Sequence, residues 1–147
     1  MRVPVLALAG ARIDRIPATA ATTFLARLRD ATWTGDIALA VGAVTDGGEL
    51  VGVAVLSPPA ADWADAFVAV SPARRRLELG TDLLVVLLDA AAHRGLGGIA
   101  CPLGADTRPA QWLSHSVGLS TRIVRSPRGA DVIAIPIHPH RAVRSWT

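Results

Sequence analysis

Apolar residues occur in short runs separated by clusters of Pro, Gly and Asp, a pattern typical of alternating strands and helices. The apolar runs predict strands over residues 3–16, 37–44, 50–56, 64–70, 97–101, 119–125 and 130–137. Apolar residues at helical spacing predict an amphipathic helix over residues 19–30 and a helix that is apolar on nearly every side over 79–94. A third helix is expected from the N-cap Thr107 to Gly118, with Pro109 in its first turn.

The connections between these runs predict how the strands pair. Asp46-Gly47-Gly48 can adopt the positive φ angles of a tight reversal, which favours an antiparallel hairpin there. A second hairpin is expected around Pro127. Strand, helix and strand over residues 64–101 form a βαβ unit, which requires parallel pairing and a right-handed crossover. The predicted fold class is therefore α/β, of the α+β kind: a central mixed, mostly antiparallel sheet with one parallel βαβ unit and flanking helices.

Composition narrows the class of protein. The chain has 147 residues, of which 51% are apolar and 18% charged, and this excludes a disordered chain. The length predicts a single domain over residues 1–137, followed by a polar tail over 138–147. The single cysteine, Cys101, excludes an internal disulfide and suits a reducing compartment. The apolar start is too short to span a membrane, so we expect a cytoplasmic protein with no membrane partner.

Basic residues do not point to nucleic acid. All 15 are Arg, but the net charge is only +3, and no other basic stripe supports the run at residues 74–76. His138 and His140 have a spacing that suits a metal, but no further Cys, Asp or Glu lies near them in the sequence. We therefore expect neither a nucleic-acid partner nor a metal site.

Residues 68–82 combine a strand end, a basic turn and the start of the buried helix. The strand ends in Val70-Ser71-Pro72, Arg75 follows, and Gly80 leads into the helix. This pattern resembles the cofactor-binding motif of the GNAT superfamily of N-acetyltransferases, and the order of elements is similar to that family from residue 37 to 137. The resemblance implies a GNAT-like fold that uses acetyl-CoA or another acyl-CoA as cosubstrate, with the pyrophosphate held by amides at a helix N-terminus. The cofactor-binding residues that it implies are Val68, Val70, Arg75, Arg76, Leu77, Gly80 and Thr81.

Two positions depart from the family pattern. Glu78 stands where the family has its first Gly, and a carboxylate 4 Å from a phosphate charge would be repelled by about 4 kcal/mol at an effective dielectric of 20. The chain contains no Tyr, so the family's usual general acid for the leaving thiolate is missing. Its position falls on Ser114, with His115 and Ser116 beside it as candidates for a relay through water.

The resemblance also implies where a base would lie. Of the two acidic residues near the strand over 64–70, Asp65 is the first candidate to take the amine proton and Asp62 is the second. Trp33 and Trp63 either wall an acceptor pocket or fill the core. The implied reaction is direct transfer of the acyl group to a small-molecule or peptide amine, with no covalent enzyme intermediate.

Other functions stay open. Glu78 and the missing Tyr favour a GNAT-fold protein that has lost catalysis and acts as a binding or scaffold subunit. A different reaction of coenzyme A thioesters, such as decarboxylation, ranks last. The apolar strand over residues 132–137 is expected at a sheet edge, where it could pair with a second copy to form a homodimer.

Overall fold

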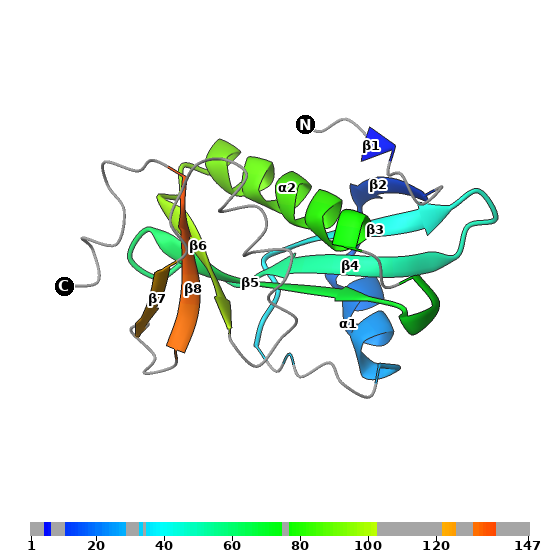
Figure 1. Cartoon of the computed structure of the whole chain (residues 1–147), viewed down its shortest axis with the longest axis horizontal. Coiled ribbons are helices and arrows are strands. Elements are labelled where there is room, and N and C mark those ends of the chain that lie inside the picture. The colour runs from blue at the N-terminus through cyan, green and yellow to red at the C-terminus, as the bar shows by residue number, and fades with distance from the viewer. Residues whose placement is uncertain are drawn as a thin grey trace.

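One mixed sheet organises the protein, and helices α1 and α2 cover its opposite faces (Figure 1). The computed structural model describes residues 5–6, 11–28, 33, 35–74, 77–102, 122–125 and 131–137. The strands are β1 (Val5–Leu6), β2 (Ala11–Arg15), β3 (Leu39–Thr45), β4 (Leu50–Leu56), β5 (Trp63–Val70), β6 (Gly98–Pro102), β7 (Arg122–Arg125) and β8 (Asp131–Pro136). The helices are α1 (Ala18–Ala26), α2 (Leu77–His93) and the short 3-10 helix η1 (Pro72–Arg74).

The strand order confirms the predicted fold class. Within the described residues the sheet has eight strands in the order β1-β2-β3-β4-β5-β6-β8-β7. Neighbouring strands are antiparallel except β5 and β6, which are parallel and are joined through α2. The predicted hairpin is also present, because the Gly48 amide donates to the Thr45 carbonyl at 2.9 Å and Gly48 has φ +85°. The βαβ unit and this hairpin were both predicted from local sequence.

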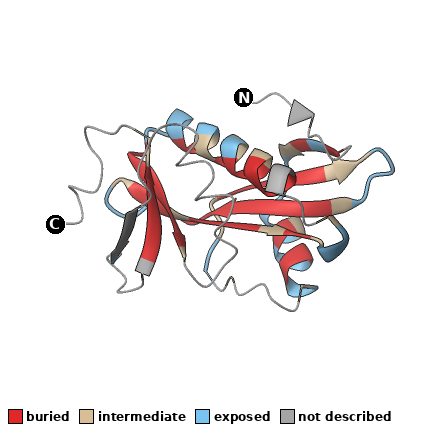
Figure 2. Cartoon of the chain, viewed as in Figure 1, coloured by how far each residue is buried: buried red, intermediate tan, exposed pale blue. Residues whose placement is uncertain are grey.

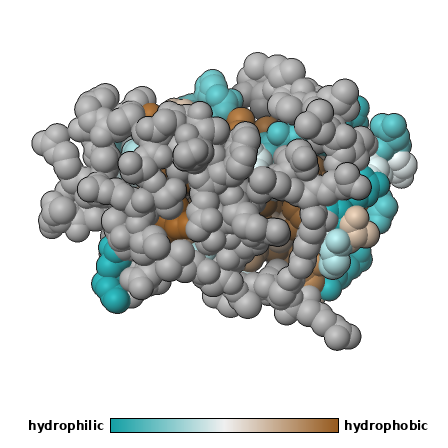
Figure 3. Space-filling model, viewed as in Figure 1, coloured by the Kyte–Doolittle hydropathy of each residue, from teal (hydrophilic) through white to brown (hydrophobic). Residues whose placement is uncertain are grey.

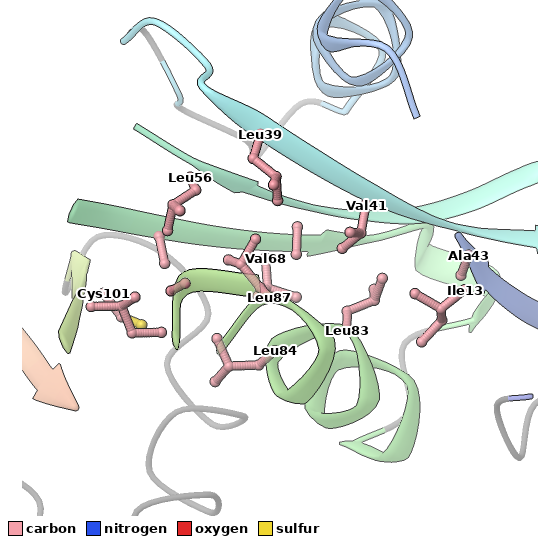
Figure 4. Close-up of a cluster of buried hydrophobic side chains, with 14 of the residues drawn as sticks. Ile13, Leu39, Val41, Ala43, Leu56, Val68, Leu83, Leu84, Leu87 and Cys101 are labelled. Carbon is pink, nitrogen blue, oxygen red and sulfur yellow. The ribbon is translucent and has the colours of Figure 1, made fainter. Parts of the chain in front are cut away.

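Helix α2 buries its apolar side against the sheet (Figure 2). Leu83, Leu84 and Leu87 are fully buried, and Figure 4 shows Leu83 and Leu87 between the helix and the strands. At Gly52 of β4 the helix approaches closely, since a Cβ there would lie 3.0 Å from Leu83 Cδ1. Val85, on the outward side of α2, is 44% exposed. Burial of one side of the helix is what holds α2 across the sheet.

The opposite face of the sheet carries a smaller core. Phe24 and Leu25 of α1 pack there against Val53 and Val55 of β4 and Phe67 of β5. Side chains alternate between faces along a strand, so Phe67 points toward α1 whereas its neighbours Ala66 and Val68 point toward α2. We call these two sides the α1 face and the α2 face of the sheet.

Three expectations from the sequence were wrong in detail. Residues 3–16 do not form one strand, because β1 and β2 fold back on each other with Val5 opposite Ile13. The strand over 132–137 is not an edge strand, because β8 lies between β6 and β7. Residues 132–134 pair on both sides, with β6 and with β7, so they offer no edge to a second copy. Helix α2 begins at Leu77 rather than at residue 79.

Two further expectations lie outside the described residues, namely the helix from Thr107 to Gly118 and the tail over 138–147. In the part of the chain that the structure describes, no helix is both long enough and apolar enough to cross a membrane.

Candidate active site

Strand β5 pairs with β6 along its first residues only, and with β4 along the rest of its length. Residues 63–65 pair in parallel with residues 98–100 of β6. Residues 66–70 pair with Gly52–Leu56 of β4, antiparallel. The β5–β6 ladder therefore ends at Asp65 and Ala100, although β6 continues to Pro102. We call this point the β5–β6 split.

Beyond the split, the backbone of Val68 faces the side from which β6 has separated. The Asp65 carbonyl accepts the Ser57 amide at 2.9 Å, and the Ser71 amide donates to the Val51 carbonyl at 2.8 Å, so both residues bond toward β4. Backbone groups of successive residues point to alternate edges of a strand. The Val68 amide and carbonyl therefore point to the other edge, where an extended ligand could bond as an added strand.

Asp65 lies at the split and is held there by Ser57. Its amide donates to Ser57 Oγ at 2.8 Å, and Ser57 is only 2% exposed. Pro58 and Pro59 follow Ser57 and lack amide hydrogens, so β4 ends here and the Ser57 hydroxyl takes the place of a backbone acceptor. The Asp65 side chain is partly exposed and points to the α1 face, as does that of Phe67 two residues later.

Asp62 occupies a strained turn before β5. Ala61 has φ 58° and Asp62 has φ 146°, values that residues with a side chain rarely adopt. The Asp62 carbonyl accepts the Gly97 amide at 2.7 Å, and a Cβ on Gly97 would lie 2.5 Å from Asp62 Oδ2. Asp62 thus ties the start of β5 to the segment before β6. Of the two predicted bases, only Asp65 lies at the split.

The two candidate tryptophans differ in their surroundings. Trp63 is 3% exposed, and a Cβ on Gly98 would lie 2.6 Å from its Cζ2 atom, so this ring fills the core over Gly98. Trp33 is partly buried and lies on the α1 face, with its ring centroid 5.8 Å from that of Phe67 at an interplanar angle of 43°. Its buried Nε1 has no hydrogen-bond partner among the described residues.

The N-terminus of α2 follows the open half of β5 after η1. The amides at the start of the helix, from Leu77 to Leu79, have no acceptors within the helix and lie at its positive dipole end. Thr81 follows and is 7% exposed, and its Oγ1 has no hydrogen-bond partner within the described chain. These amides and the hydroxyl have the chemistry of an anion site.

Cys101 is a buried cysteine of β6. It is buried on the α2 face, one residue past the end of the β5–β6 ladder. Burial, and after it the charge of Asp65, raises the pKa of the Cys101 thiol from 9.0 to about 12. The thiol is therefore protonated at neutral pH and packs as a small apolar residue of the core.

The described surface residues do not point to a further site. In the view of Figure 3, the described side chains near the β3–β4 turn are hydrophilic, and apolar side chains are visible in recesses nearer the centre. Among the described residues, no group of three His, Cys, Asp or Glu could hold a metal ion.

Residues 14–113 match the acetyltransferase (GNAT) family. The chain belongs to the GNAT family. This confirms the resemblance drawn from residues 68–82, and the parallel β5–β6 pair joined through α2 lies within the matched range. None of the curated proteins compared with the chain matches it.

Solved structures of GNAT proteins share the fold. The ribosomal-protein-S18-alanine N-acetyltransferase from Escherichia coli is 24% identical, with a TM-score of 0.62 over 87% of this chain and 94% of its own. A GNAT family N-acetyltransferase from E. coli in complex with CoA is 16% identical, with a TM-score of 0.63 and coverages of 95% and 86%. A phosphinothricin acetyltransferase from Sinorhizobium meliloti in complex with AcCoA is 14% identical, with a TM-score of 0.63 and coverages of 88% and 89%.

Several residues predicted for the GNAT site lie outside the described part of the chain. They are Arg75, Arg76, Ser114, His115 and Ser116, and the two histidines considered for a metal, His138 and His140, also lie outside it. The backbones of Leu77 and Glu78 belong to α2, but their side chains are not described. The structure thus brings together Asp65, Val68 and Val70 along β5, with Gly80 and Thr81 in the helix that follows η1.

Sequence reasoning missed two residues of this GNAT domain. Ser57 was not singled out, yet a hydroxyl just before two prolines is a signal for a side-chain acceptor at a strand end. Phe67 was not singled out, although its spacing of two from Asp65 already places both side chains on one face.

Proposed function

We propose that the protein is an acyl-CoA-dependent N-acyltransferase that transfers an acetyl or other acyl group directly to an amine. The observation that carries this proposal is the β5–β6 split. It leaves one edge of β5 turned away from β4 beside Asp65, and the N-terminus of a helix follows in the chain. Membership of the GNAT family supports the same proposed activity.

The chain's own residues fit an acyl-CoA. The backbone of Val68, and that of Val70 with the same orientation, would bond to the amides of the pantetheine arm. The first-turn amides from Leu77 to Leu79 would receive the pyrophosphate beside Gly80, and the buried Oγ1 of Thr81 would gain the partner that the described residues do not supply. By family resemblance, Arg75 and Arg76 would add charge. The thioester supplies an activated carbonyl carbon to this site.

Asp65 is proposed as the base. It would accept a proton from the attacking amine as the new C–N bond forms at the thioester carbonyl. The C–S bond then breaks, and the coenzyme A sulfur takes a proton, so that the products are the N-acyl amide and free coenzyme A. Ser114, through His115, Ser116 or water, is proposed to deliver that proton in place of the missing Tyr.

The alternative is a GNAT-fold protein that binds partners without catalysis. Glu78 lies in the first turn of α2, where a carboxylate suits the positive end of the helix dipole and competes with a phosphate. If the Glu78 carboxylate occupies the anion site, acyl-CoA is excluded.

One experiment separates these two functions. The melting temperature is measured with and without millimolar acetyl-CoA for the wild type, Glu78→Gly and a control, Glu49→Gly, in the exposed β3–β4 turn. A ligand at 100 times its Kd adds about 2.7 kcal/mol, which is readily seen as an upward shift. Amine panels with mass-spectrometric detection of the added acetyl group then test transfer.

We expect a shift in the wild type and in Glu49→Gly. A shift confined to Glu78→Gly would replace the enzyme with the binding-subunit alternative. Absence of a shift in all three proteins would contradict an acyl-CoA site.

A further inference from the structure

Ser57 bonds to both main-chain polar groups of Asp65. The Ser57 amide donates to the Asp65 carbonyl at 2.9 Å, and the Asp65 amide donates to Ser57 Oγ at 2.8 Å. The Ser57 hydroxyl itself donates to the Pro58 carbonyl at 3.3 Å, which leaves its lone pairs for the Asp65 amide. A regular antiparallel ladder would use a main-chain carbonyl as this acceptor. At Asp65 the acceptor is thus a side chain, which a substitution can remove.

This bond lies where the pairing of β5 changes. The β5–β6 ladder ends at Asp65 and Ala100. On the other side of β5, strand β4 ends at Leu56, one residue before Ser57. The Ser57 hydroxyl therefore supplies a bond to β5 at the point where β4 stops and where β6 separates from β5.

The hydroxyl is buried, which makes it hard to replace. Ser57 is 2% exposed, so water does not readily take the place of its oxygen. A buried amide that loses its acceptor bears the cost of its desolvation, and this favours a shift of the main chain that bonds it elsewhere. Because the side chain follows its Cα atom, such a shift would also displace the Asp65 carboxylate.

Displacement of a reacting group has a large effect on catalysis. A misplacement of about 1 Å can lower a rate about 100-fold, because proton transfer needs donor and acceptor within hydrogen-bond distance. We propose that Ser57 is a positioning residue for acyl transfer, which acts through the main chain of Asp65. The inference rests on the proposed function, in which the Asp65 carboxylate accepts the amine proton.

A residue with this role affects the chemical step more than the binding of acyl-CoA. Residues 66–70 keep their own pairing with β4, so the proposed contacts of Val68 and Val70 with the pantetheine arm stay in place. Ser57→Ala should therefore lower kcat by about tenfold to 100-fold and leave the KM for acetyl-CoA nearly unchanged.

A double-mutant cycle tests the route through Asp65. The kcat for transfer from acetyl-CoA to an amine is measured in the wild type, Ser57→Ala, Asp65→Asn and the double variant. Where the carboxylate is already absent, Ser57→Ala should change kcat by no more than about twofold. An equal fall of kcat in both backgrounds would show a purely structural role and overturn the proposal.

Further variants control for the loss of a hydroxyl. Thr45→Ala is the matched control, because Thr45 Oγ1 also accepts a main-chain amide, that of Glu49 at 3.1 Å, but lies in the β3–β4 turn. Its kcat should equal that of the wild type. Ser57→Thr keeps the hydroxyl and should retain most of the activity. Ser57→Cys, which has nearly the same shape and a weaker acceptor, takes the place of Ser57→Ala in the cycle if the alanine variant does not fold.

Hydrogen exchange and kcat together separate failure of this role from failure of the proposed function. Without acetyl-CoA, the Asp65 amide should exchange faster in Ser57→Ala than in the wild type, whereas the Phe67 amide should change little. A wild type that transfers no acyl group to any amine would contradict the proposed function, and the role of Ser57 with it. An active wild type and an inactive Asp65→Asn, with full kcat in Ser57→Ala, would overturn only the role of Ser57.

Discussion

The first and second parts of β5, residues 63–65 and 66–70, differ in which neighbouring strands and side chains cover them. Residues 63–65 form the closed part. They pair with β6, the Trp63 ring packs over Gly98, and the Asp65 amide donates to the Ser57 hydroxyl. Residues 66–70 pair with β4 and lie beyond the end of the β5–β6 ladder, and side chains among them still fill the core on the α2 face. A strand can thus be packed on its faces and open along one edge. We infer that the closed part provides stability and that the open part provides the binding site.

The largest predicted effect is the loss of activity when Asp65, at the boundary between the two parts, is replaced. Asp65→Asn removes the proposed base with little change of shape, so kcat for acyl transfer should fall by about 10²- to 10⁴-fold. Initial rates with a responsive amine measure this effect. Asp62→Asn is the control, because Asp62 lies before the closed part. A loss in Asp62→Asn that equals the loss in Asp65→Asn would contradict the assignment of Asp65.

The closed part should be intolerant of added volume. A Cβ at Gly98 overlaps the Trp63 ring, which is 3% exposed and has little room to move. Gly98→Ala should therefore lower the free energy of unfolding by about 1–3 kcal/mol in urea titrations. In Gly47→Ala the nearest atom would be Thr45 Oγ1 at 3.9 Å, so this control should stay within about 0.5 kcal/mol of the wild type. An equal effect of the two variants would show that the closed end is not tightly packed.

A smaller effect is predicted for Cys101 at high pH. Its pKa is about 12 when folded, against 9.0 when exposed, so between these values the unfolded chain holds fewer protons and stability falls as pH rises. The expected loss from pH 7 to pH 10 is about 1 kcal/mol. The chain has neither Tyr nor Lys, so few other groups titrate in this range.

Urea titrations of the wild type and Cys101→Ala at pH 7 and pH 10 measure this loss. The variant should lack the dependence that the wild type shows. The same pH dependence in both proteins would show that Cys101 is not buried at the split.

Local patterns in the sequence predicted most of the fold but not the split. The Asp46-Gly47-Gly48 turn and the helix after Pro72 follow from residues close in sequence, and both were confirmed. The interior position of β8 depends on pairing between β6 and β8, which apolar content alone does not report. The contact of Trp33 with Phe67 joins residues far apart in sequence, so no periodicity could have shown it.

The two candidate bases came from the family resemblance, and their roles stay predictions. Asp65 was favoured over Asp62 from its closeness to the strand, and the structure places Asp65 at the end of the β5–β6 ladder. Ser57 was missed because its contribution depends on β4 ending opposite Asp65. Which edge of β5 is open follows from strand register, which the sequence does not report.

Residue-resolved amide hydrogen exchange of β5, with and without acetyl-CoA, tests the central claim most directly. The Val68 amide faces the open edge, whereas the Phe67 amide faces β4. Acetyl-CoA should slow exchange at Val68 markedly more than at Phe67 and at residues 63–65. Unchanged exchange at Val68 in protein that binds acetyl-CoA, or equal slowing along all of β5, would contradict an acyl-CoA site at the β5–β6 split.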